Sequence, residues 1–303
     1  MAKHQIKCSS FLLLFLRSEA LFMLKQRIIT ALLLMVVLLP AMFYREPWPF
    51  NLLALVFIAA AAWEWAKANG GSHGFSLAMG GVCCMVCGAM WWAGWLQQSL
   101  PRLWLFAGAA WVLGGALILK AGVAAWTRHA RYLRLLGGLL ALSLAWLAIA
   151  QAKVIGSNFL LSVLALVWVA DISAYFAGRA WGGRWSRSKL AASISPGKSW
   201  EGVWGGMVGV VLLAFVWRYV DVIMGASVSS LYTHLSDKNF LLLIVASVFM
   251  SAMSVVGDLI ESLVKRSAGI KDSSGLLPGH GGVLDRVDAL LPTLPLAMML
   301  YSL

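Results

Sequence analysis

Five of the twelve acidic residues in this chain fall within one short stretch near the C-terminus, between Gly257 and Asp288. Asp258 and Glu261 are three residues apart at the end of an apolar segment, so they share one face of a helix. Two further acids have the same spacing where the next apolar segment begins. The five acidic residues are Asp258, Glu261, Asp272, Asp285 and Asp288.

A loop rich in glycine separates the two acidic pairs and carries several basic residues. Carboxylates suit Mg²⁺, which prefers one or two protein carboxylates together with substrate phosphates. Basic side chains and glycine amides suit phosphate oxygens. The stretch therefore predicts a site for a metal and a polyphosphate. For any single pair, such as Glu261 with Lys265 four residues on, a helix-end salt bridge is an equally good interpretation. The basic residues of the loop are Lys265, Arg266, Lys271 and His280.

The segment from Ser262 to Asp288 resembles the signature of the bacterial phosphatidate cytidylyltransferase family, the CDP-diacylglycerol synthases. It reads SLVKRSAGIKDSSGLLPGHGGVLDRVD, with an additional serine, Ser274, where family members often read K-D-S-G. Two upstream segments, 171–179 and 195–202, also resemble the family. The likeness is strong over residues 157–303 and mostly hydropathic before them.

The resemblance implies the reaction of CTP with phosphatidate to give CDP-diacylglycerol and pyrophosphate, without a covalent enzyme intermediate. It implies Mg²⁺ as cofactor, with K⁺ as an expected second cation. We expect Asp258, Asp285 and Asp288 to ligate the metal and, with Lys271, to be catalytic. The residues expected to bind substrate are Lys198, Ser195, Lys265, Arg266, His280, Asp171 and Tyr175.

The upstream segments have independent interpretations as well. Asp171 lies deep in an apolar run, where it either pairs with Tyr175 one turn on or lines the substrate cavity. The turn 195–199 precedes a helix, and a helix N-terminus beside Lys198 favours phosphate. Taken alone, this turn is more simply interpreted as a basic loop.

The composition shows which elements must position these residues. Of the 303 residues, 61% are hydrophobic and 12% are charged, whereas soluble domains carry roughly 45–50% and about 25%. The apolar stretches are continuous rather than alternating, which excludes an outer-membrane barrel. The chain is therefore predicted to be an all-α polytopic membrane protein.

Nine apolar segments are predicted to span the membrane. The last carries Pro292 and Pro295, so we expect it to be bent or broken. We expect an N-terminal extension 1–22, or translation from Met23, then membrane helices in 23–156 and a catalytic region in 157–303 with cytoplasmic loops 179–201 and 264–285. The nine segments are 28–44, 50–68, 75–96, 102–120, 132–150, 157–178, 202–220, 240–263 and 286–303.

The net charge of +12 comes from basic residues that collect in alternate loops. Basic loops face the cytoplasm, so we expect a cytoplasmic N-terminus, an external C-terminus and location in the bacterial inner membrane. This distribution explains the charge without nucleic acid. The expected partners are CTP, phosphatidate and membrane lipids, and a homodimer is a further expectation.

Other polar residues are better explained by packing. Cys83 and Cys87 lie in an apolar helix with no nearby histidine, and Glu64, between two tryptophans, is expected to have a structural partner. Three other functions remain as alternatives. A CDP-alcohol phosphotransferase would need a D-G-x2-A-R pattern that is absent. A secondary transporter would place its charges at mid-membrane. An inactive relative would tolerate loss of the acidic residues, which are intact here.

Overall fold

The computed structural model describes residues 25–186 and 188–303, so the predicted extension 1–22 lies outside the described part. The described residues form helices joined by loops, with two isolated β-bridges and no longer strands. The first helix is Lys25–Phe43. The others are α2 Trp48–Ala68, α3 His73–Trp92, α4 Pro101–Ala121, α5 Val123–Trp126, α6 Arg131–Ile155, α7 Ser157–Trp181, α8 Trp200–Met224, α9 Leu231–Lys238, α10 Phe240–Ser267, α11 Leu284–Val287 and α12 Leu290–Tyr301.

Eight helices in the described residues are long and apolar enough to cross a membrane, which confirms the all-helical prediction. The prediction of nine spans is not confirmed. The ninth segment is broken into the single turn α11 and the 12-residue α12. Twelve residues reach about 18 Å, less than the ~30 Å hydrocarbon core. The break and the short length agree with the expected effect of Pro292 and Pro295, which cannot donate backbone hydrogen bonds.

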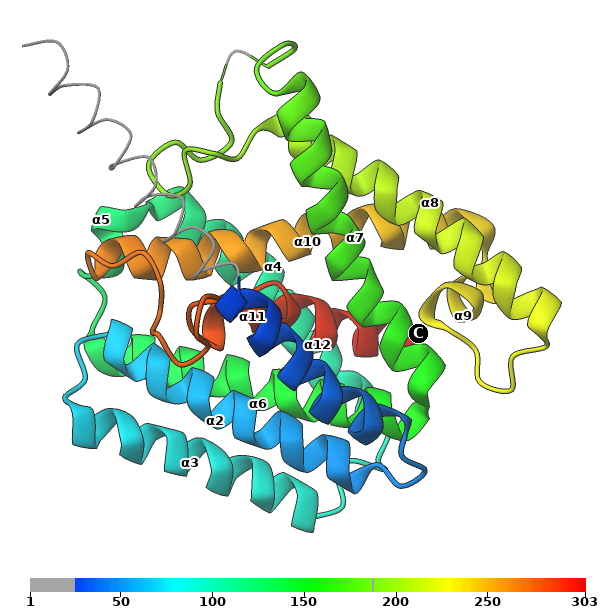
Figure 1. Cartoon of the computed structure of the whole chain (residues 1–303), viewed down its shortest axis with the longest axis horizontal. Coiled ribbons are helices and arrows are strands. Elements are labelled where there is room, and N and C mark those ends of the chain that lie inside the picture. Colours follow the sequence, from blue (N-terminus) through cyan, green and yellow to red (C-terminus); the bar gives the residue numbers. More distant parts are fainter. Residues whose placement is uncertain (1–24, 187) are drawn as a thin grey trace, which may run out of the picture.

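The helices surround α12 on several sides. In Figure 1, α10 and α4 lie on one side of α12 and α6 lies on the other, with α2 and α3 beyond it. The side chains of α12 from Leu291 to Met298 are buried. The short last helix is therefore a core element, and the end of the preceding loop, Gly282 and Val283, is buried next to it.

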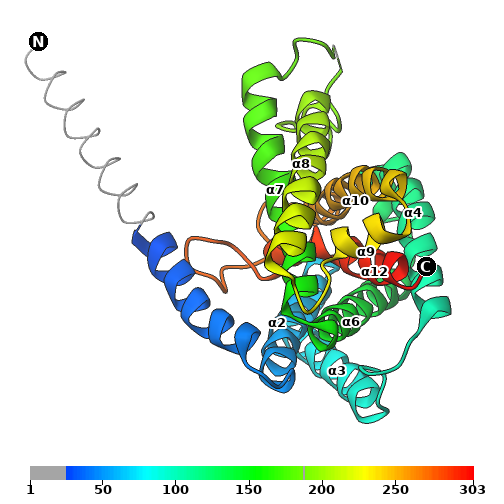
Figure 2. The ribbon, with the colours of Figure 1, turned by 90° about the vertical axis from the view of Figure 1, so that its right-hand side faces the viewer.

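The hairpin of α7 and α8 rises away from the other helices in Figure 2. A stripe of glycines on α8 lets the two backbones approach closely, as small residues do in membrane helix pairs. A Cβ atom on Gly205 would lie 2.1 Å from the Cβ of Ala177, and one on Gly209 would lie 2.1 Å from Ser173 Oγ. The hairpin is thus held by backbone proximity rather than by large interlocking side chains.

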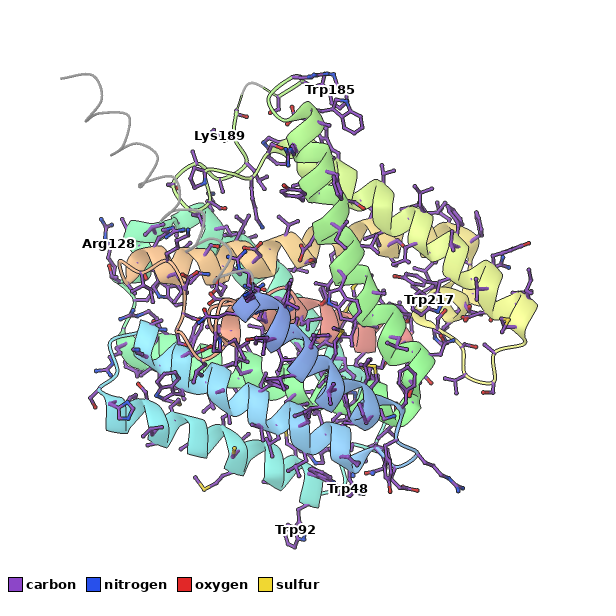
Figure 3. All side chains as sticks on the ribbon, viewed as in Figure 1. Trp48, Trp92, Arg128, Trp185, Lys189 and Trp217 are labelled. Carbon is purple, nitrogen blue, oxygen red and sulfur yellow. The ribbon has the colours of Figure 1, made fainter. Side chains whose placement is uncertain are left out.

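Tryptophans lie at both ends of the bundle, and Trp185 lies toward the same end as Lys189 (Figure 3). Figure 3 shows Trp48 and Trp92 together at one end of α2 and α3, while Arg128 and Lys189 lie toward the opposite end. Trp92 is 94% exposed. Tryptophan is typical of membrane interfaces, and basic loops are typical of the cytoplasmic side.

Candidate functional site: an anchored loop between α10 and α12

The loop 268–283 is anchored by a glutamate from a distant part of the chain. Glu64, on α2, is fully buried. Its carboxylate accepts hydrogen bonds from the amides of Val283 at 3.0 Å and Leu284 at 2.6 Å, and from the hydroxyls of Ser273 and Ser274. The structural partner that the sequence predicts for Glu64 is therefore the loop carrying the signature residues.

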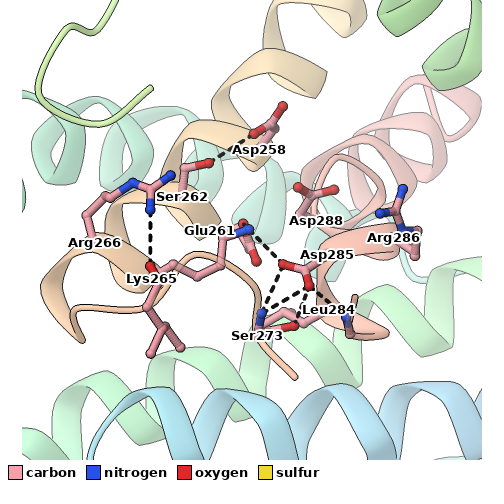
Figure 4. Close-up of polar contacts among 12 residues, drawn as sticks. Asp258, Glu261, Ser262, Lys265, Arg266, Ser273, Leu284, Asp285, Arg286 and Asp288 are labelled. Carbon is pink, nitrogen blue, oxygen red and sulfur yellow. Dashed lines mark hydrogen bonds and ion pairs between the residues drawn. The ribbon is translucent and has the colours of Figure 1, made fainter. Parts of the chain in front are cut away.

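Asp285 is the centre of a second set of contacts within the same loop. It accepts hydrogen bonds from the amides of Gly282 at 2.7 Å and Ser273 at 3.0 Å, and from the Ser273 hydroxyl at 2.9 Å. Lys265 on α10 lies 2.7 Å from Asp285 and 2.6 Å from Glu261 (Figure 4). Asp285 therefore joins α10, the loop and α11, and the salt bridge of Glu261 with Lys265 forms as the simpler interpretation expects.

The loop closes tightly because a glycine lies where these two carboxylate clusters meet. A Cβ atom on Gly282 would lie 2.0 Å from Ser273 Oγ and 2.4 Å from a carboxylate oxygen of Glu64. No other residue type fits this position without moving the loop. The glycine of the signature is thus required by the approach of Glu64 and Ser273.

Asp258 and Asp288 approach each other from α10 and from the turn before α12. Gly257 makes this possible, because a Cβ atom there would lie 2.4 Å from the carbonyl oxygen of Asp288. In Figure 4 both carboxylates face the same region, away from the contacts of Asp285. Lys198, from the loop before α8, donates to Asp258 at 2.5 Å. Three distant segments therefore meet at one charged site.

The two acids near α11 have opposite electrostatic environments. Burial and the negative charge of Asp258 raise the pKa of Asp288 to about 8. Burial also acts to raise the pKa of Asp285, but its hydrogen bonds with Glu261, Lys265 and the loop amides outweigh burial and lower it below the ordinary value. Asp285 is therefore stabilised as a carboxylate, whereas Asp288 needs additional positive charge to ionise.

These contacts test whether the predicted ligands fit a divalent metal. The described residues contain no group of three metal-ligating side chains close enough to hold an ion together. The carboxylate of Asp285 already accepts hydrogen bonds from Lys265 and the loop. Asp258 and Asp288 present hard oxygen donors to one region, and two carboxylates completed by substrate phosphates are what Mg²⁺ prefers. The donor set thus fits Mg²⁺ through two of the three predicted ligands, and ligation stays a prediction.

Several predicted substrate-binding residues border this region, but not all. Asp171 on α7 lies near enough to Asp258 and Lys198 for their charges to act on it, and it is exposed. It does not pair with Tyr175, whose hydroxyl accepts from Arg179 at 3.0 Å. Ser195 forms a tight turn that ends in Lys198, with the amide of Lys198 donating to its carbonyl at 3.2 Å.

The remaining basic residues have other environments. Arg266 donates to the carbonyls of Ile194 and Ile270 and so joins the two loops. Lys271 is exposed. The carbonyl of His280 accepts from Arg286, and its ring Nδ1 is buried without a hydrogen-bond partner among the described residues. Lys265 is paired with the carboxylates of Glu261 and Asp285. The sequence predicts that Lys265 binds substrate, and that role stays a prediction.

Glu201 contributes to the site in a way that sequence reasoning did not find. It is 2% exposed at the start of α8, and its carboxylate accepts from the amides of Trp185 at 3.1 Å and Ser186 at 2.8 Å. It fixes the loop that presents Lys198. It lies in the segment 195–202 that resembles the family, and this resemblance was the signal that could have found it.

Comparisons with known proteins agree with this geometry. Residues 25–303 match the description of the cytidylyltransferase family. A phosphatidate cytidylyltransferase of Pseudomonas aeruginosa is 38% identical over 284 residues, covering 92% of this chain and 98% of the relative. A protein of the same name from Haemophilus influenzae is 35% identical over 92% of this chain and 99% of its own. One from Thermotoga maritima is 39% identical over about half of each chain, 49% and 50%. This match over residues 25–303 and these relatives show that the chain belongs to the cytidylyltransferase family.

Proposed function

We propose that this protein is a phosphatidate cytidylyltransferase, which makes CDP-diacylglycerol and pyrophosphate from CTP and phosphatidate. One observation carries the proposal: Asp258 on α10 and Asp288, at the end of the segment that bears the family signature, face a common region beside Lys198 (Figure 4). A secondary transporter has no specific support in this geometry.

The reaction needs no protein nucleophile. A phosphate oxygen of phosphatidate forms a bond to the α-phosphorus of CTP, and the bond from that phosphorus to the β-bridging oxygen breaks, so pyrophosphate leaves. Both reactants are anions that repel one another. Catalysis therefore requires positioning and charge neutralisation, as in other phosphoryl transfers.

The residues divide into two roles. Lys198 is placed to exchange its contact with Asp258 for a substrate phosphate, and the helix N-terminus after it adds favourable dipole charge. Lys271 and His280 lie in the loop and are proposed to contact phosphate oxygens. Asp285 and Lys265 are proposed to hold the loop rather than to contact substrate.

We propose Asp258 and Asp288 as the residues that hold Mg²⁺, with a second cation such as K⁺ as a further proposal. Bound there, Mg²⁺ would supply positive charge to the phosphate oxygens. The raised pKa of Asp288 supports this assignment, because a carboxyl beside Asp258 ionises readily only with a nearby cation.

We also propose that the site opens to the cytoplasm and that the protein lies in the bacterial inner membrane. Asp258 is nine residues from the end of α10, or about 14 Å along the helix, so the site is recessed from the loop side. The predicted homodimer remains a proposal, which native mass spectrometry of detergent-solubilised protein would check.

The test is a mixed-micelle assay of the purified full chain with phosphatidate and labelled CTP, with and without Mg²⁺. We expect Mg²⁺-dependent CDP-diacylglycerol, and a loss of at least about 100-fold in Asp288→Asn because a charge acting on the transition state is removed. Asp237→Asn is the matched control, since Asp237 is exposed on α9.

Two results would contradict parts of the proposal. Undiminished product from Asp288→Asn would overturn the metal assignment but keep the reaction. No product from folded wild type, with several lipids and detergents, would overturn the reaction itself.

A further inference from the structure

An apolar cavity of about 350 Å³ lies next to the signature loop. Its walls come from the first helix, α2, α6, α7 and α12. Val283 and Val287 of the signature segment also line it. Arg286 is the one charged residue among those lining it. One part of the cavity wall is therefore the signature segment directly before Asp288, since Arg286 and Val287 line it.

The outer wall of this cavity is the first helix, Lys25–Phe43, which is attached mainly at its two ends. Near one end, Arg27 donates to the carbonyl of Gly279 at 2.9 Å and Thr30 donates to that of Pro278 at 3.0 Å. At the other end, Lys153 on α6 donates to the carbonyl of Met42. Only 6% of the residues in the apolar stretch of this helix are buried.

The face of this helix that turns inward repeats at helical spacing. Leu34, Leu38 and Met42 line the cavity four residues apart, while most of their neighbours are exposed. From Leu34 to Met42 the helix advances about 12 Å. One leaflet of the hydrocarbon core is about 15 Å deep, so the cavity runs along most of the length of an acyl chain.

The charged residues that line the cavities favour this one over a larger cavity elsewhere in the bundle. A cavity of about 550 Å³ between α4, α6 and α10 is lined by the carboxylate of Glu261 and by Arg134, which already donates to Asn69. A lipid phosphate would meet a carboxylate there. In the first cavity it meets Arg286, which donates to the carbonyl of His280, and no carboxylate is among the described residues that line this cavity.

We propose that the cavity behind the first helix holds one acyl chain of the lipid substrate, with its phosphate end toward Arg286. This inference rests on the proposed function and adds where the lipid tail lies during the reaction. The chain would enter between the two attached ends of the first helix. Its length would be limited at the deep end near Ala54 and Phe50, which precede Glu64, the α2 residue that contacts the signature loop, by 10 and 14 residues.

The experiment compares two phosphatidates, dioctanoyl and dioleoyl, in mixed micelles with the full chain. Ala54→Trp fills the deep end, which a long chain needs and a short chain does not reach. We expect the ratio of kcat/KM for the long lipid to that for the short lipid to fall about tenfold. Val56→Trp is the matched control, because Val56 lies two residues away on the same helix and is 60% exposed.

Each outcome decides the inference. A fall of the ratio in Ala54→Trp but not in Val56→Trp supports the cavity. An unchanged ratio, with wild type using both lipids, overturns this inference and leaves the proposed function intact. If wild type uses neither lipid, both this inference and the proposed function are overturned. Should Ala54→Trp fail to fold, Leu38→Trp fills the cavity from the first helix, and the same ratio decides.

Discussion

Two aspartates three residues apart, Asp285 and Asp288, have different roles because their neighbours differ. Asp285 accepts hydrogen bonds from the loop amides and from Lys265, which lowers its pKa. Asp288 faces Asp258, and its pKa is raised to about 8. At the scale of single residues, one acid is held as a carboxylate by the loop and Lys265, whereas the other ionises readily only beside an added cation.

The ion pair of Asp285 with Lys265 gives a prediction about stability and pH. The two side chains are 7% and 12% exposed. Asp285→Asn should therefore destabilise the protein by about 3 kcal/mol at neutral pH. Since the folded pKa lies below the unfolded value of about 3.9, the contribution of Asp285 is complete above about pH 4 and is lost as the pH falls further.

Thermal unfolding in detergent at pH 6 and pH 3 checks this prediction. The difference in Tm between wild type and Asp285→Asn should narrow at pH 3. A difference of equal size at both values would show that the carboxylate charge of Asp285 is not what stabilises the loop.

Glu64 gives a second prediction, because its carboxylate accepts two amides and two hydroxyls. In Glu64→Gln the amide nitrogen would face donors, and we expect a loss of about 3 kcal/mol. Backbone hydrogen exchange over residues 273–284 should rise, and activity should fall with it. Glu46→Gln, at an exposed position, is the control; equal exchange in both variants would argue against the anchor.

At the scale of elements, the site depends on helices that differ from standard spans. The 28-residue α10 carries Asp258, Glu261 and Lys265 on neighbouring turns. The short α12 begins inside the bundle, where the turn before it packs against Gly257 of α10. Together they bring Asp258, Asp288 and the end of the loop into the bundle, where Glu64 of α2 contacts the loop and Lys198 contacts Asp258.

The α7–α8 hairpin gives a prediction at this scale. In Gly205→Val the first added carbon would lie 2.1 Å from Ala177 Cβ, so the helices must separate. We expect a loss of about 1–3 kcal/mol and lower activity, because α8 begins directly after Lys198. Val208→Leu on the exposed face of α8 is the control. A Tm for Gly205→Val equal to that of the control would contradict the close packing.

At the scale of the whole molecule, the ends of the bundle are proposed to lie on opposite sides of the membrane. A cysteine at Gly275, in the signature loop, should react with an impermeant thiol reagent only from the cytoplasm. A cysteine at Ser227, between α8 and α9, should react from outside. Both positions are exposed. Labelling of Gly275→Cys in intact spheroplasts, in a cysteine-free background, would show that the orientation is opposite to the one proposed.

The sequence by itself determined the helical membrane class, the break in the last segment and the residues of the signature loop. Continuous apolar runs, two prolines and a cluster of acids in an uncharged chain are local properties, so they can be read without a fold. The likeness of Ser262–Asp288 to one family named the chemistry before any contact was known.

The tertiary structure decided which residue does what. Spacing treats Asp285 and Asp288 alike, but only the fold shows that Lys265 and the loop amides neutralise one of them. In the sequence Glu64 looks isolated because its partner loop is distant along the chain. Glu201 looks isolated because the loop that it contacts has no pattern of its own. Only three-dimensional packing sets the partners of a buried charge, so the number of spans and the division of roles required the structure.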